Sequence, residues 1–263
     1  MFSAQLTTAP EADASTAQAS TTFDLDIFMA YQPVVDVEAE KIVAYEALVR
    51  GASGRAEASL LSRVTAENRA DFDRRCRRVA IETGSALGLE RDLSINFMPS
   101  AVEDCDDFIQ TLQWTAEEFD FPMDQLMLEY SETDRHSAIP HLKEICRLTR
   151  RTGVRTVIDD FGGGFAGLTR FTYLRPSMVK LDPSLTTKID LDPRRRAIVS
   201  GVQAICFDLG IDLVAKGVET PTQAEALRDC GVVLMQGIAL AEPALERILG
   251  DHDITIPASI ADS

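Results

Sequence analysis

The sequence predicts an α/β fold, specifically a TIM-type (β/α)8 barrel with an irregular first strand. Short apolar, β-branched runs alternate with longer amphipathic segments, which is the pattern of repeated βα units, and eight such runs can be counted. The length of 263 residues also suits this fold. Barrels of this type run to about 250 residues as one domain. An open doubly wound sheet is the alternative architecture.

The predicted strands are apolar runs bounded by turn residues. They cover residues 28–35, 42–49, 93–97, 126–130, 156–160, 178–181, 213–216 and 232–236. Amphipathic patterns between them predict helices near 62–87, 101–119, 139–151, 194–209 and 222–230. Since only a short segment separates the first two strands, a hairpin is expected there in place of a helical crossover.

The domain organisation follows from composition. Residues 1–24 have low hydrophobicity and no periodicity, which predicts a flexible leader. The barrel domain is expected over 25–250, with a tail over 251–263. The leader lacks the basic and apolar regions of a signal peptide, and no apolar stretch is long enough to span a membrane. Five widely spaced cysteines without a CxxC pair favour a reducing, cytoplasmic location.

The formal net charge is -16, which argues against a DNA-binding or RNA-binding surface. A ligand that carries phosphate would need a bound cation or a few well-placed basic residues, since either reverses the local field inside an acidic protein.

Ionisable and amide side chains stand at the ends of the predicted strands, where the chemistry of a barrel lies. They are Glu46, Asn96, Glu129, Asp159, Asp160, Lys180, Asp182, Lys216, Glu219 and Gln236. Buried carboxylates need compensation by pairing or by metal. Carboxylates with one amide carbonyl are hard ligands that suit Mg²⁺ or Mn²⁺ better than zinc.

The Asp159–Asp160 pair is the most informative feature of this set. Neighbouring carboxylates can hold one or two metals about 3.5 to 4 Å apart, which activates water and clamps a phosphoryl group. The pair therefore predicts hydrolysis of a phosphate ester. Any single acidic residue is more simply a solvated or ion-paired side chain, but the set favours a site. The glycines at 162–164 fit either a tight turn or a mobile loop.

Residues 45–50, Tyr-Glu-Ala-Leu-Val-Arg, resemble the signature of EAL domains, the cyclic di-GMP phosphodiesterases of bacterial signalling. Further matches follow in the same order and span nearly the whole chain after the leader. They are Ser94-Ile95-Asn96, Glu129-Tyr130-Ser131-Glu132, Ile158-Asp159-Asp160-Phe161-Gly162, Val179-Lys180-Leu181-Asp182, Gly217-Val218-Glu219-Thr220, and Gln236-Gly237 with Pro243.

The resemblance implies hydrolysis of cyclic di-GMP to linear pGpG with Mg²⁺ or Mn²⁺. By position, the ligands of a first metal are matched by Glu46, Asn96, Glu129 and Asp159, and a ligand of a second metal by Asp160. Lys180 resembles the lysine that holds the attacking water, and Asp160 and Glu219 complete the implied catalytic set.

The implied substrate contacts are Gln32, Arg50 and Gln236, of which Arg50 suits a phosphate through its planar donor fork. Glu132 resembles the glutamate that anchors the loop after the fifth strand. Dimers are common in the family, so a homodimer is expected. The sequence shows no attached sensor, so regulation is expected from a protein partner or from oligomerisation.

The chain departs from the family pattern at a few positions. Ser131 and Gly163 stand where the family usually has Thr, and Ile238 stands where it has an aromatic residue. The important departure is Lys216, because the family carries a glutamate there that helps to hold the second metal. A lysine about 4 Å from a dication is opposed by roughly 8 kcal/mol at an effective dielectric constant near 20.

Lys216 is therefore expected either to pair with Asp160 or to turn out to solvent. The first function that follows is a cyclic di-GMP phosphodiesterase. The alternative is a catalytically weakened EAL module that acts as a cyclic di-GMP receptor or as a protein-interaction domain. A barrel enzyme that acts on another phosphodiester is a third reading.

Overall fold

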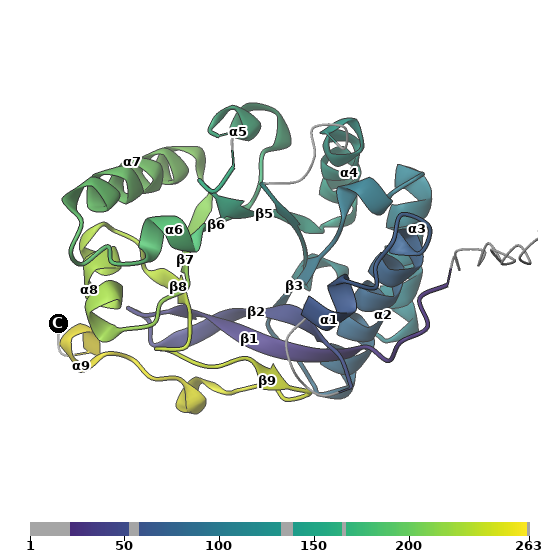
Figure 1. Ribbon diagram of the computed structural model, residues 1–263, viewed down its shortest axis with the longest axis horizontal. Helices are drawn as coiled ribbons and strands as arrows, with labels where there is room; N and C mark the ends of the chain where they lie inside the picture. Colours follow the sequence, from purple (N-terminus) through teal and green to yellow (C-terminus); the bar gives the residue numbers. More distant parts are fainter. Residues whose placement is uncertain (1–21, 53–57, 133–138, 165–166, 262–263) are drawn as a thin grey trace, which may run out of the picture.

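A computed structural model describes residues 22–52, 58–132, 139–164 and 167–261. Its strands form one nine-stranded sheet in the order β2-β3-β4-β5-β6-β7-β8-β1-β9, and β1 also pairs with β2. That pairing closes eight of the strands into a barrel, around which the helices are arranged (Figure 1). The predicted fold class is confirmed.

The strands lie close to the predicted ranges. They are β1 (Phe28–Asp36), β2 (Lys41–Arg50), β3 (Asp92–Asn96), β4 (Leu126–Ser131), β5 (Arg155–Phe161), β6 (Met178–Leu181), β7 (Asp212–Lys216), β8 (Leu234–Gln236) and β9 (Ala244–Leu245). The connection from β1 to β2 is a hairpin, as expected, and β1 is antiparallel to both of its barrel neighbours. The β9 strand was not predicted, because its ladder is only two residue pairs long.

The helices lie on the outside of the barrel. They are α1 (Ala58–Leu61), α2 (Arg69–Ala86), α3 (Cys105–Glu118), α4 (Ile139–Thr152), α5 (Thr169–Leu174), α6 (Pro183–Thr186), α7 (Pro193–Leu209), α8 (Pro221–Asp229) and α9 (Ala258–Ala261), with short 3-10 turns at Pro99–Ala101, Met123–Gln125 and Asp251–Asp253. None of the helices in the described part of the chain is both long and apolar enough to cross a membrane.

Side-chain caps explain where several helices begin. Asp104 accepts a hydrogen bond from the backbone of Asp107, so α3 begins later than the predicted residue 101. The helix predicted from residue 62 begins later, at Arg69, because the Asn68 side chain accepts from the backbone of Thr65 and holds a turn before α2. A capping box formed by Thr220 with Gln223 begins α8.

Described residues of the predicted leader and of the predicted tail both pack against the rest of the domain. Residues 1–21 of the predicted leader lie outside the described residues. Phe23 is buried, and its ring centroid lies 4.6 Å from that of Phe72 on α2. In the predicted tail, the Asp251 carboxylate accepts a hydrogen bond of 2.8 Å from the backbone N–H of Ile42.

A glycine after β8 allows two segments at the carboxyl end of the barrel to meet. The backbone N–H of Val218 donates to the oxygen of Gln236 (3.2 Å), and that of Ala239 donates to the oxygen of Val218 (3.0 Å). A Cβ atom at Gly237 would overlap the backbone of Val218. Glycine is therefore required by close packing at this position.

We predict that Gly237→Ala lowers the free energy of unfolding by about 1–3 kcal/mol, because the added methyl group overpacks a backbone contact. Gly201→Ala is the matched control, since a Cβ at that exposed position on α7 meets no atom within 4 Å. The control should gain up to about 1 kcal/mol from helix propensity. Urea unfolding measures both, and equal midpoints would contradict the prediction.

Candidate active site at the carboxyl end of the barrel

The charged residues stand one layer above an apolar cluster. That cluster takes one residue from each of six strands: Val34, Ala44, Met127, Val157, Met178 and Val214. Side chains alternate between the two faces of a strand, so residues two positions apart share a face. Glu46, Glu129, Asp159, Lys180 and Lys216 each follow a cluster member by two positions. All five therefore project into the barrel at its carboxyl end.

Lys180 is fully buried between two of the carboxylates. Its Nζ lies 2.7 Å from Glu46 Oε2 and 2.5 Å from Glu129 Oε2. Burial alone would raise the pKa of Glu46, but the ammonium groups of Lys180 and Lys216 outweigh it and lower that pKa to about 2. Burial and the charge of Glu46 raise the pKa of Glu129 to about 8.

Lys216 joins the two neighbouring aspartates. Its Nζ lies 2.5 Å and 2.6 Å from the two carboxylate oxygens of Asp159, and 3.2 Å from Asp160 Oδ1. Burial tends to lower the pKa of Lys216, but Glu46 and Asp159 hold it above its usual range. Of the two expected positions, the lysine therefore occupies the paired one, and its closer partner is Asp159.

Hydroxyl and amide groups donate further hydrogen bonds to the carboxylates. Ser94 Oγ donates to Glu129 Oε2 (2.6 Å), and Ser131 Oγ donates to Asp160 Oδ2 (3.1 Å). Glu46 accepts from Asn96 Nδ2 (3.3 Å) and from Gln236 Nε2 (2.9 Å). Gln236 Nε2 also lies 3.3 Å from Gln32 Oε1.

The two serines were not among the predicted site residues. They were missed because the site was predicted mainly from ionisable side chains, and serine is neutral. The available signal was strand periodicity, since Ser94 shares a strand face with Asn96, and Ser131 shares one with Glu129.

The loop after β5 is fastened by Glu132. The carboxylate of Glu132 accepts hydrogen bonds of 2.6 Å from the backbone N–H groups of Gly162 and Gly167. The buried Arg170 donates from Nη2 to the backbone oxygen of Glu132 (2.7 Å). A Cβ at Gly163 would lie 2.7 Å from Asp182 Oδ2, so a threonine here would require the aspartate to move.

Asp160 has a positive φ of 52°. Non-glycine residues adopt this conformation at a cost of about 1–3 kcal/mol, and such strained residues tend to cluster at functional sites. Its side chain is held from two strands, by Lys216 on β7 and by Ser131 on β4. These bonds keep Asp160 beside Asp159 in spite of the unfavourable backbone.

Two predicted residues, Glu219 and Arg50, take no part in the ion pairs of the charged cluster. Glu219 is exposed and borders a cavity of about 220 Å³. Arg50, at the end of β2, donates from Nη1 to the backbone oxygen of Val49 (2.8 Å). The same 220 Å³ cavity is also lined by Gln32, Glu46, Leu48, Lys216, Gly217, Gln236, Gly237 and Ile238.

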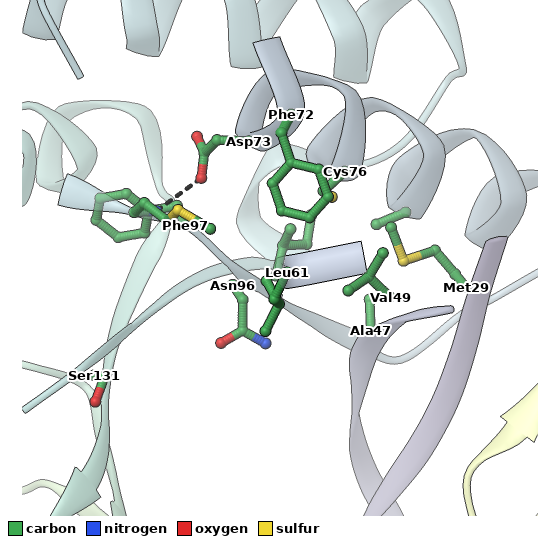
Figure 2. A pocket seen from close by; sticks show the side chains of 13 residues that line it. Met29, Ala47, Val49, Leu61, Phe72, Asp73, Cys76, Asn96, Phe97 and Ser131 are labelled. Carbon is green, nitrogen blue, oxygen red and sulfur yellow. Dashed lines mark hydrogen bonds between the residues drawn. The ribbon is translucent and has the colours of Figure 1, made fainter. Parts of the chain in front are cut away.

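A second cavity, of about 300 Å³, is mainly apolar (Figure 2). Phe72 and Cys76 of α2 face Val49 and Ala47 of β2 across it. Asn96 and Ser131 also line it. Asn96 therefore borders this apolar space and also contacts Glu46 of the charged cluster.

The expected metal site has two halves. The first half holds the residues expected at the first metal, and the second half is the place beside Asp160 where a second metal is expected. Among the described residues, no group of three or more His, Cys, Asp or Glu side chains is placed so that it could hold a metal ion. In the first half, Glu129 Oε1 is buried without a hydrogen-bond partner, so one hard oxygen is left for a cation. In the second half, the ammonium of Lys216 lies between Asp159 and Asp160.

We predict that Lys180→Met lowers the free energy of unfolding by about 3–5 kcal/mol, because Glu46 and Glu129 lose their nearest counter-charge in a buried site. Lys41→Met, at an exposed position on β2, is the control and should be nearly neutral. Adding Glu129→Gln to Lys180→Met should recover part of the loss. Urea unfolding of the variants tests this, and a Lys180→Met protein as stable as the control would refute it.

The chain resembles known proteins over most of its length. The model of the EAL domain family matches residues 17–243. Cyclic di-GMP phosphodiesterase RocR of Pseudomonas aeruginosa is 33% identical over 167 residues, which are 63% of this chain and 42% of RocR. A standalone EAL protein from Vibrio cholerae O395, solved with cyclic di-GMP bound, superposes with a TM-score of 0.83 at 35% identity and covers 92% of this chain and 100% of that chain.

BlrP1 of Klebsiella pneumoniae has been solved in several states. Its complex with manganese and cyclic di-GMP has a TM-score of 0.81 at 28% identity, and covers 86% of this chain and 58% of that chain. Its complex with cyclic di-GMP and FMN but no metal ions has a TM-score of 0.71 at 25% identity, with 86% and 56% covered. This chain thus spans less than two thirds of RocR and of BlrP1. Since the family model covers most of its residues, the chain belongs to the EAL domain family.

Proposed function

We propose that the chain binds cyclic di-GMP at the carboxyl end of its barrel and hydrolyses it to pGpG only slowly. The observation that carries this proposal is the position of Lys216 Nζ, 2.5 Å from Asp159 Oδ1 and 3.2 Å from Asp160 Oδ1. Asp160, the residue expected at a second metal, and the neighbouring Asp159 are already paired with an ammonium group. Of the functions expected from the sequence, this geometry favours the weakened EAL module.

Binding is supported by the polar groups that face the 220 Å³ cavity. Gln32, Glu46 and Gln236 line it, and Gln236 Nε2 donates hydrogen bonds to the other two side chains. Arg50, with its guanidinium fork, is proposed as a contact to a phosphate of the dinucleotide. The Vibrio cholerae and BlrP1 structures contain cyclic di-GMP, and one BlrP1 complex contains it without metal ions. Cyclic di-GMP is therefore the proposed ligand.

The first half of the site offers one buried oxygen, Glu129 Oε1, to a hard cation. The described side chains are not placed to hold a metal ion as they stand, so Glu46, Asn96, Glu129 and Asp159 are proposed to hold Mg²⁺ or Mn²⁺ after a rearrangement of the site. A cation there would polarise a phosphoryl oxygen and lower the pKa of bound water. This half of the site supports slow hydrolysis as a second candidate activity.

The second half does not fit a cation. A dication about 4 Å from the Lys216 ammonium would be opposed by roughly 8 kcal/mol at an effective dielectric constant near 20. Asp160 is therefore proposed to form an ion pair with Lys216 and not to bind a metal. Lys180 is proposed to neutralise Glu46 and Glu129, and in a substrate complex to donate to the attacking water. Glu132 is proposed to anchor the loop that carries Gly162 and Gly167.

We predict that Lys216→Glu raises the rate of pGpG formation by roughly 10²-fold in Mg²⁺ or Mn²⁺, because it restores an acidic residue where the family has one and removes the opposing charge. Chromatography of cyclic di-GMP incubations measures the product.

Lys216→Gln is the matched control, since it removes the positive charge without supplying a carboxylate, and it should gain much less activity. A wild-type rate that is already appreciable and that Lys216→Glu leaves unchanged would sink the proposal. The homodimer, the regulatory protein partner and the cytoplasmic location stay predictions.

A further inference from the structure

The outer side of α4 carries a row of basic side chains. Lys143, Arg147, Arg150 and Arg151 are all exposed, and their spacing places them on one side of the helix. The short helix α5 lies beside α4 on the outside of the barrel (Figure 1). Arg175, at the carboxyl end of α5, is exposed as well. These five residues are called the α4–α5 basic face.

Contacts between the two helices join the five residues into one surface. The Nζ atom of Lys143 lies 4.3 Å from the centroid of the Tyr173 ring on α5. Arg150 Nη1 donates a hydrogen bond of 3.4 Å to the backbone oxygen of Leu174, the residue before Arg175. The basic groups of α4 therefore extend directly onto the end of α5.

This face lacks the counter-charges that basic side chains have elsewhere in the protein. The chain has 42 Asp and Glu residues against 26 Lys and Arg residues, so carboxylates are in excess. Arg78 is paired with Glu118, for example. On the basic face, Arg147 is paired with Glu144, whereas none of the other four residues forms an ion pair with any described residue.

Helix stability explains only part of this arrangement. Cations in the last turn of a helix interact favourably with its dipole, which accounts for Arg150 and Arg151. Lys143 stands in the first half of α4, and Arg175 belongs to another element, so the dipole of α4 gives no reason for either of them. The excess positive charge on this face is therefore suited to an external anionic partner.

The size of the face favours a short acidic segment over an extended polyanion. From Lys143 to Arg151 the helix rises by about 12 Å, which is roughly two turns. A nucleic acid or an anionic membrane would extend beyond this length. It would then approach the other surfaces of a protein of net charge -16 within the Debye length of about 10 Å at 0.1 M salt. A short peptide segment can be confined to the face.

We propose that the α4–α5 basic face is a docking surface for an acidic segment of a partner protein, with carboxylates about one helical turn apart. The inference goes beyond the proposed binding of cyclic di-GMP. None of the five residues lines the 220 Å³ cavity or forms an ion pair of the charged cluster. The partner and the dinucleotide would therefore occupy different parts of the domain.

The test is fluorescence anisotropy of the full chain with a labelled probe, a helical alanine peptide that carries glutamates one turn apart. The probe should bind saturably in low salt and more weakly in about 0.3 M NaCl. The triple variant Arg150→Glu, Arg151→Glu, Arg175→Glu should bind it at least tenfold more weakly, because three attractive charges become repulsive.

The matched control makes the same change in net charge at exposed positions outside the face. It combines Lys41→Glu, Arg63→Glu and Arg194→Glu, and it should keep most of the affinity for the probe. Circular dichroism establishes that both variants are folded. In calorimetry, the Arg150, Arg151 and Arg175 variant should bind cyclic di-GMP as the wild type does.

Four results would overturn the inference. They are the absence of saturable probe binding in low salt, an equal loss of affinity in the control variant, and tighter binding of a single-stranded oligonucleotide of the same charge. The fourth is a wild-type dimer in sedimentation that the triple variant dissociates, which would assign the face to a second copy of this chain. Loss of cyclic di-GMP binding by the wild type would count against the proposed function and not against this surface.

Discussion

Pairing of the buried Lys180 and the half-buried Lys216 with four carboxylates is the interaction on which the carboxyl end of this barrel depends. Lys180 holds Glu46 and Glu129 together, and Lys216 holds Asp159 and Asp160 together. The charged side chains pack on a buried layer of aliphatic and methionine side chains inside the barrel, which excludes water on that side. In such surroundings an unpaired carboxylate would be protonated or would destabilise the fold. Each lysine therefore has a structural role in addition to the chemical role proposed for it.

The same pairing makes the proposed phosphate-bearing ligand compatible with an acidic protein. Net charge acts over the whole surface, whereas a ligand in a cleft responds mainly to the groups that line it. Here Lys216 lines the 220 Å³ cavity together with the amide side chains of Gln32 and Gln236. Relative to the glutamate that the family resemblance implies here, Lys216 reverses one charge beside the aspartates. Among the departures from the family pattern, it has the largest electrostatic effect.

Much of the fold could be predicted because strand and helix periods are local properties of the sequence. All eight barrel strands and the opening hairpin were predicted within a few residues. Errors arose where a single side chain decides a boundary, as Asn68 does before α2 and Asp104 does before α3. The short β9 strand depends on β1, which lies more than 200 residues earlier, and it carries no local pattern.

By itself, the sequence determined which residues stand at the strand ends, because the alternation of a strand places Glu46, Glu129 and Asp159 on one face with Ala44, Met127 and Val157. It left the position of Lys216 open between Asp160 and solvent. The tertiary structure decided that choice, and the main partner is Asp159. The reason is geometric: β5 and β7 are separated in the sheet by β6, and only closure of the barrel sets the distance across its mouth. A flexible side chain forms the ion pair that this distance permits.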